Sequence, residues 1–185
     1  MTDARYERSR AAVHSAVCSV LVTEGISGLT VDRLADESDV SRSTIYRNWP
    51  DMAALACEVF DELMHREPVD ISGDWTAALH DYLADYARRL NDPVYTAVLV
   101  ALIEGSSRDE AFADVHRRAF SQSRSRAGEI VRRGQAAGGI GASRNVQQCV
   151  EDMVAPFLYR RLVTQRRITR AHVARLHADL VTRWT

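Results

Sequence analysis

The chain has 185 residues, a formal net charge of −1 and a hydrophobic fraction of 46%. These values are typical of one globular domain, or of a small module joined to a larger one, and they exclude an intrinsically disordered chain. All 24 basic residues are arginines. Chemistry that depends on lysine, such as a Schiff base or a phosphate-binding P-loop, is therefore excluded.

The sequence predicts a cytoplasmic protein without a membrane span. Its longest apolar run covers about Tyr95–Ile103, whereas a spanning helix needs about 20 such residues. The first residues alternate in charge and predict no secretory signal. Three widely spaced cysteines, Cys18, Cys57 and Cys149, provide neither a disulfide framework nor a metal-binding spacing, and we expect free thiols.

Charge is unevenly distributed along the chain. Residues 1–50 hold six arginines and seven acidic residues, residues 51–115 hold four and 14, and residues 116–185 hold 14 and four. A basic segment can indicate a polyanionic partner. Because these arginines lie among strong apolar stripes, we favour the simpler interpretation that the basic segment packs beside the acidic one.

Apolar residues recur at helical spacing along almost the whole chain, which predicts an all-α protein. The expected helices cover about residues 5–24, 31–38, 42–48, 52–66, 75–91, 93–105, 108–137, 145–165 and 170–184. A capping box over Ser107–Glu110 is expected to open the seventh helix. Pro156 is expected to bend the eighth, because proline removes one hydrogen bond of the helix.

The second and third of these helices are short and form a predicted helix-turn-helix. Thr30 and Ser41 are suited to cap their amino ends, and Asp39 tolerates the left-handed backbone that a tight turn needs. Only Ile45 and Trp49 on the third helix are clearly apolar, so it should expose a polar face to phosphates and base edges. A solvated surface helix is the alternative interpretation. The polar residues are Arg42, Ser43, Thr44, Tyr46, Arg47 and Asn48.

This region resembles the DNA-binding domain of TetR-family (tetracycline-repressor-like) transcriptional regulators. The matching stretches are Thr30-Val-Asp-Arg-Leu-Ala35, Val40-Ser-Arg-Ser-Thr-Ile-Tyr-Arg-Asn-Trp49, and Asp51 followed by Leu55. The resemblance implies a helix-turn-helix domain over residues 1–50 and a helical ligand-binding and dimerisation domain over residues 51–185. It also implies a sequence-specific DNA-binding regulator without a cofactor, a ligand-responsive repressor that binds a palindromic operator as a homodimer.

Specific roles follow from the resemblance and from the side chains. Thr30, Thr44 and Tyr46 are expected to contact phosphates, whereas Arg42 and Ser43 should face base edges. Arg47 could contact either, and Asn48 completes the DNA-binding set.

Three positions depart from the family pattern. Asp39 stands where glycine is usual, Asn48 where tyrosine or histidine is usual, and Met52 where a phosphate-binding lysine is common. The departures predict modest electrostatic affinity for DNA, so that binding should depend on dimerisation and on specific contacts.

An apolar stripe on the last helix predicts a dimer interface. On a monomer this stripe would leave an apolar patch exposed, which favours a homodimer. The expected interface residues on this helix are Val173, Leu176, Leu180 and Trp184, and the resemblance of Pro156–Leu162 to the penultimate helix of the family adds Phe157.

The middle helices are expected to enclose a small-molecule pocket that combines apolar surface with a few polar groups. The alternative for each candidate lining residue is an ordinary place in the core. The candidates are Trp75, Tyr82, Tyr86, Leu102, Phe112, His116 and Phe120.

The sequence leaves two alternative functions. An enzyme is disfavoured because Glu62-x-x-His65 is only half of a di-iron motif, and we expect no metal or catalytic residues. The other alternative is a helical-bundle adaptor or binding protein that has lost specific DNA binding, which Met52, Asn48 and the weakly charged amino-terminal segment motivate.

Overall fold

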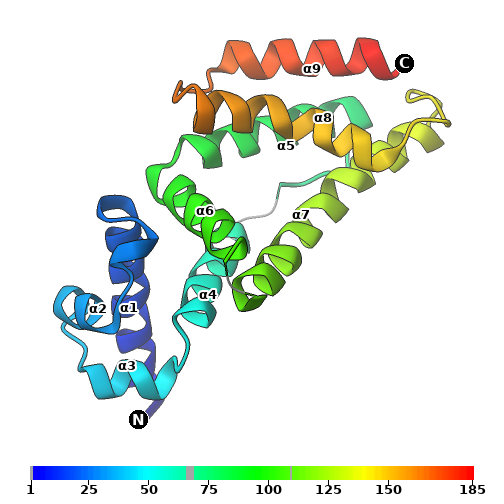
Figure 1. The fold of residues 1–185 in the computed structure, drawn as a ribbon. Coiled ribbons are helices and arrows are strands. Elements are labelled where there is room, and N and C mark those ends of the chain that lie inside the picture. Colours follow the sequence, from blue (N-terminus) through cyan, green and yellow to red (C-terminus); the bar gives the residue numbers. More distant parts are fainter. Residues whose placement is uncertain (1, 66–68, 109) are drawn as a thin grey trace. The chain divides into compact units, whose positions relative to one another are not determined.

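The computed structural model describes residues 2–65, 69–108 and 110–185, and these residues form helices without a strand (Figure 1). The all-α prediction is confirmed. A 3₁₀ turn, η1 (Ile26–Gly28), and a π turn, η2 (Tyr159–Val163), accompany nine α-helices in this part of the chain. The α-helices are α1 (Thr2–Thr23), α2 (Val31–Ser38), α3 (Arg42–Asn48), α4 (Met52–His65), α5 (Trp75–Asn91), α6 (Pro93–Ser106), α7 (Glu110–Ala136), α8 (Val146–Leu158) and α9 (Arg170–Trp184).

The helices form two compact units that interleave along the chain. The first unit contains α1 to α4, α6 and α7 as far as residue 119. The second contains α5, α7 from residue 120, α8 and α9. The expected functional boundary between residues 50 and 51 remains a prediction.

The first unit has its core along one face of α1. Val13, Val17 and Val20 are buried there, as helical spacing predicts. Helix α1 packs against α2 and α6, and α4 also packs against α6. Because α2 and α3 are short, their position depends on this tertiary packing rather than on their own helix propensity.

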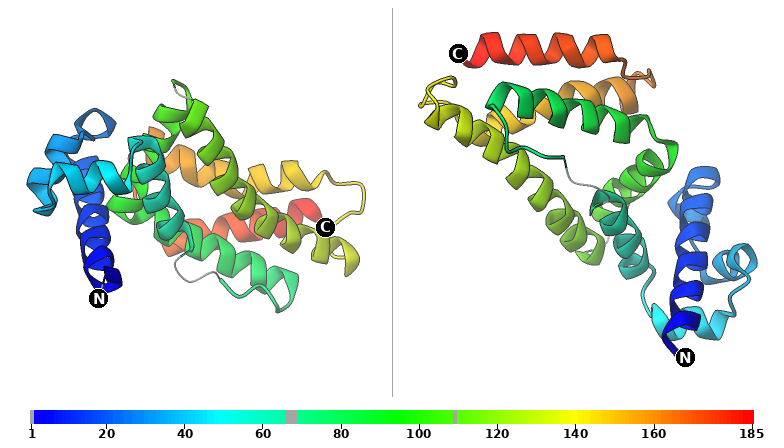
Figure 2. Two further views of the ribbon diagram at one scale, coloured as in Figure 1. Left: turned by 90° about the horizontal axis from the view of Figure 1, so that it is seen from below. Right: turned by 180° about the vertical axis from the view of Figure 1, so that it is seen from behind.

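The second unit places α5, α8 and α9 side by side, as Figures 1 and 2 show. Asn91, at the end of α5, ties down the segment before α9: its Nδ2 donates to the carbonyl of Ile168 at 2.7 Å, and its Oδ1 accepts from the Ile168 N–H at 3.0 Å. A capping box opens α9, in which the Thr169 N–H donates to Nδ1 of His172 at 3.2 Å.

The predicted helix over residues 145–165 is present as α8, and it widens into a π turn after Pro156. The α-helix ends at Leu158 and continues as η2. Proline provides no N–H to the helical hydrogen bonds, and the chain then widens, so that the Thr164 N–H donates to the Tyr159 carbonyl five residues earlier at 3.1 Å.

Two other predictions touch residues outside the described part of the chain. The expected end of the fourth helix at Arg66 is one, and the capping box over Ser107–Glu110 includes residue 109 and is another. Within the described residues, α7 begins at Glu110, and the Ser107 hydroxyl donates to the carbonyl of Glu104 at 2.8 Å.

Candidate DNA-binding site

Helices α2 and α3 form the predicted helix-turn-helix. The Arg33 N–H donates to the Thr30 hydroxyl at 3.2 Å, and the Thr44 N–H donates to the Ser41 hydroxyl at 3.4 Å, so both expected caps are present. Asp39 takes the left-handed conformation with φ of 55°. The turn therefore forms as expected, with aspartate in place of the usual glycine.

Helix α3 is fixed by its apolar side, and its polar side faces outward. Ile45 and Trp49 are 0% and 3% exposed. Six of the predicted DNA-binding residues lie on α3, and Thr30 lies at the start of α2. Of these seven, Thr30, Arg42, Ser43, Tyr46 and Arg47 are exposed, and Thr44 and Asn48 are half-buried. Tyr46 is 59% exposed, so its side chain does not contribute to the core.

Hydroxyl groups gather at the amino end of α3. The Ser41 Oγ lies 3.2 Å from the Ser43 Oγ and 2.9 Å from the Thr44 Oγ1. Hydroxyls at the start of a helix are suited to bind phosphate oxygens. This arrangement is consistent with the expected phosphate contact of Thr44.

Arg42 makes a contact that sequence reasoning missed. Its Nε lies 3.0 Å from the Asp32 Oδ1, which joins the first turns of α3 and α2. The two residues are ten positions apart, and the turn at Asp39 brings them together. Nothing in their local sequence indicates this pairing.

A second missed feature is a polar cluster that braces α3 against α1 and α4. The Trp49 Nε1–H, at the end of α3, donates to the Glu58 Oε2 at 2.8 Å. His14 Nδ1 lies 2.8 Å from the Glu62 Oε2, and Arg10 donates to Glu58. We call these five residues the bracing cluster. Arg10 with His14, and Glu58 with Glu62, are spaced i and i+4 on their helices, which was an available sequence signal.

The bracing cluster holds Glu58 ionised. Burial by itself would raise the pKa of this carboxyl, but hydrogen bonds from Trp49 and Arg10 and the nearby charges of His14 and Arg10 lower it below its ordinary value. A carboxylate with a lowered pKa stabilises the folded state fully above its ordinary pKa. This contribution is lost as the pH falls through the lowered value.

Glu58→Gln is therefore expected to lower the free energy of unfolding at pH 7, by about 1–3 kcal/mol for a partly buried charged hydrogen bond. The difference from the unsubstituted protein should shrink once the pH falls below about 4.5, the ordinary value for this carboxyl. Urea unfolding between pH 7 and pH 3 measures it. Glu129→Gln, on the exposed side of α7, is the control. An equal loss at every pH would contradict this role of the charge.

The predicted pocket residues are divided between the two units. Tyr82 and Tyr86 stack in the second unit with ring centroids 6.3 Å apart, and the Tyr82 hydroxyl lies 3.3 Å from the Ser123 Oγ. Trp75 and Phe120 also belong to this unit, whereas Leu102, Phe112 and His116 belong to the first. Trp75, Tyr82, Tyr86 and Leu102 are buried, and Phe112, His116 and Phe120 are half-buried.

Four of the five predicted dimer-interface residues are buried within a single protomer. Phe157, Val173, Leu180 and Trp184 are between 0% and 5% exposed within a single protomer. The stripe of α9 is already covered by the protomer, because α9 packs along α5 and α8. Phe157 contacts Tyr86, with ring centroids 6.5 Å apart. Only Leu176 remains partly accessible.

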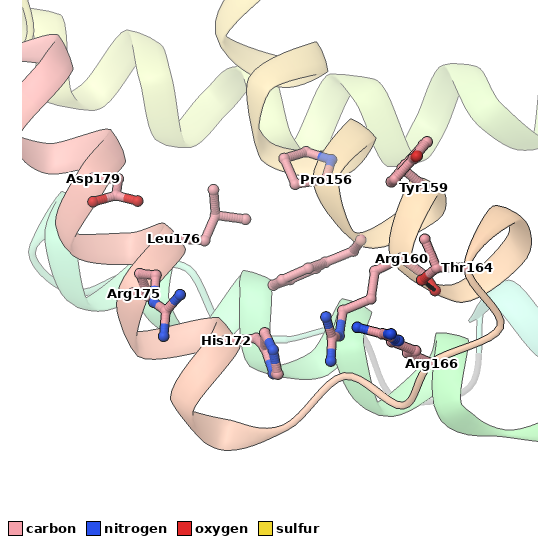
Figure 3. A pocket seen from close by; sticks show the side chains of 10 residues that line it. Pro156, Tyr159, Arg160, Thr164, Arg166, His172, Arg175, Leu176 and Asp179 are labelled. Carbon is pink, nitrogen blue, oxygen red and sulfur yellow. Dashed lines mark hydrogen bonds between the residues drawn. The ribbon is translucent and has the colours of Figure 1, made fainter.

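A groove of about 360 Å³ lies over α8, η2 and α9 (Figure 3). Leu176 and Pro156 border it, and Arg160, Arg166 and His172 gather at one end. Partial burial and the charges of Arg160 and Arg175 lower the pKa of His172. Tyr159 and Val163 on η2 are 62% and 65% exposed.

The described residues contain no group of three or more histidine, cysteine, aspartate or glutamate side chains placed to hold a metal ion. Glu62, half of the di-iron pattern, contacts His14 instead. None of the helices in the described ranges is both long and apolar enough to cross a membrane.

Comparison with known proteins defines the class to which this fold and this helix-turn-helix belong. Residues 15–59 match the model of bacterial regulatory proteins of the tetR family, and residues 68–180 match the tetracyclin repressor-like C-terminal domain. The chain belongs to the TetR family of DNA-binding transcriptional regulators.

Individual relatives support the same family assignment. The chain is 28% identical over 171 residues to the HTH-type transcriptional regulator YdeS of Bacillus subtilis, which covers 91% of this chain and 86% of that protein. It is also 28% identical to the TetR family transcription regulator SCO0332, with a TM-score of 0.66 over 94% of this chain and 97% of that one. A TetR regulator from Agrobacterium tumefaciens shares the fold, with 18% identity and a TM-score of 0.71 over 95% and 94%.

Proposed function

We propose that the protein is a ligand-responsive repressor that binds a palindromic operator as a homodimer in the cytoplasm and has no enzymatic activity. The observation that carries this proposal is the exposed polar face of α3, held by a buried apolar side and by the bracing cluster. Arg42, Ser43 and Arg47 read base edges, and Thr30, Thr44 and Tyr46 contact DNA phosphates. Asn48 belongs to the same DNA-binding surface.

The proposed dimer uses the groove over α8, η2 and α9 rather than the buried stripe of α9. Leu176, Pro156 and Tyr159 provide accessible apolar surface there, and Asp179 and Arg175 provide charges of both signs. Val163 on η2 is also exposed. A second copy related by a two-fold axis covers this face and brings two α3 helices to half-sites about 34–36 Å apart.

The proposed effector site lies within the second unit, beside Tyr82 and Tyr86. Tyr82 and Tyr86 offer stacked aromatic surface together with a hydroxyl close to Ser123. These features are suited to bind an aromatic or apolar small molecule with one polar end. Binding lowers operator affinity by a coupling energy of about 1–3 kcal/mol.

Selection from a pool of random duplexes with the purified full-length protein tests the proposal. We expect an enriched inverted repeat whose affinity falls steeply as salt rises. The double variant Arg42→Ala and Arg47→Ala should lose the enrichment. Arg108→Ala, with a side chain 75% exposed beyond α6, is the control and should keep it. Failure of the unsubstituted protein to enrich any sequence would contradict the proposal and favour the adaptor alternative.

A further inference from the structure

The ion pair between α2 and α3 lies on the same surface as the proposed base-reading residues. Arg42 is the first residue of α3, and Asp32 is in the first turn of α2. The Arg42 Nε lies 3.0 Å from the Asp32 Oδ1, and the two side chains are 61% and 67% exposed. A pair this exposed contributes little to folding stability. We therefore consider its effect on ligand binding at this surface.

The atoms used by this contact determine what Arg42 can still bind. A guanidinium has five N–H donors in a fixed plane. The carboxylate of Asp32 lies beside Nε, so the terminal Nη1 and Nη2 groups remain as donors for another partner. Two parallel donors of this kind match the O6 and N7 acceptors of guanine in the major groove. The pairing also fixes rotamers of a long side chain that would otherwise lose entropy on binding.

The charge balance favours a base over a phosphate as the partner of Arg42. Asp32 offsets the positive charge of Arg42 and repels phosphate oxygens nearby. Arg33, the arginine of α2, is already engaged by Glu24 at 2.7 Å and by Glu37 at 2.8 Å. An arginine whose charge is offset keeps directional hydrogen bonds but loses part of its non-specific attraction to the backbone.

We propose that Asp32 is a positioning residue that orients Arg42 and thereby sets a guanine preference in each half-site. This inference rests on the proposed function, and it assigns to Asp32 a role in specificity at a cost in non-specific affinity. Asp36, one turn later on α2, is also exposed. It carries the same charge on the same helix and is the matched control.

The test uses full-length protein and the duplex recovered by selection, with guanine replaced by 7-deazaguanine, which lacks the N7 acceptor. The unsubstituted protein is expected to bind the guanine duplex about 5- to 100-fold more tightly, the range of one bidentate contact. Asp32→Asn should reduce this ratio to within about 2-fold and should increase affinity for unrelated duplexes, because a negative charge has been removed. Asp36→Asn should also increase non-specific affinity but keep the guanine ratio, and Asp32→Glu should restore part of it.

Three outcomes would overturn the inference in distinguishable ways. If the unsubstituted protein enriches no sequence, the proposed function and this inference both fail. If enrichment occurs but Arg42→Ala keeps the 7-deazaguanine ratio, Arg42 does not read guanine. If Arg42→Ala loses the ratio while Asp32→Asn and Asp36→Asn both keep it, Arg42 reads guanine without help from Asp32.

Discussion

Replacing Trp184 with alanine is expected to lower the free energy of unfolding of the protomer by about 3–5 kcal/mol, the range for truncating a buried tryptophan. Trp184 is 0% exposed, and its indole nitrogen has no hydrogen-bond partner in the described part of the chain. The loss therefore comes from the cavity left beside α5 and α8 rather than from a broken hydrogen bond. Urea unfolding monitored by circular dichroism measures it.

Leu176→Ala is the matched control on the same helix. Leu176 borders the groove and is partly accessible, so its truncation should weaken association between copies while leaving the protomer core intact. We expect the unfolding midpoint of Trp184→Ala to fall at every protein concentration, and that of Leu176→Ala to fall only at concentrations high enough for the unsubstituted protein to associate. A Trp184→Ala protein as stable as the unsubstituted one, but monomeric, would contradict this account and support the predicted interface role of Trp184.

Replacing Trp49 with alanine is expected to cost a similar amount, about 3–5 kcal/mol, and also to abolish operator binding. Trp49 fills the core at the end of α3 and donates to Glu58. Its loss opens a cavity and leaves a partly buried carboxylate without one of its donors. Trp49→Phe keeps most of the bulk and should show a smaller loss, about 1.5–3 kcal/mol for a hydrogen bond to a charged group.

Tyr46→Ala separates support of α3 from contact with DNA. Because Tyr46 is exposed on α3, its removal should weaken operator binding and leave the urea midpoint unchanged. Fluorescence anisotropy with a labelled operator duplex and urea unfolding give the two readouts. If Trp49→Ala unfolds like the unsubstituted protein, or if Tyr46→Ala is equally destabilised, the division between the two sides of α3 is incorrect.

The sequence predicted local features well, because their causes are local. The caps at Thr30 and Ser41 and the turn at Asp39 depend on side chains within three residues of the backbone groups they satisfy. Helix positions followed from apolar spacing. The widening after Pro156 was only partly predictable, because proline indicates an interruption but not whether the chain bends or forms a π turn.

Partners across the fold were not predictable in the same way. The stripe on α9 indicates that Val173, Leu180 and Trp184 are buried, but periodicity does not tell whether the covering surface is the same protomer or a second copy. The structure identifies α5 and α8 as that surface. The pairs Asp32 with Arg42 and Trp49 with Glu58 depend on turn geometry and on helix packing, which a list of residues does not contain.

Methylation protection of guanine N7 on the selected operator tests most directly whether α3 reads the major groove as part of a dimer. The modification occurs in the major groove, so it reports on the surface that Arg42 is proposed to contact. We expect protection in two symmetric half-sites about 10–10.5 base pairs apart, centre to centre. Arg42→Ala should remove this protection. Protection of a single site, or uniform reactivity on a duplex that the protein binds tightly, would contradict this mode of recognition.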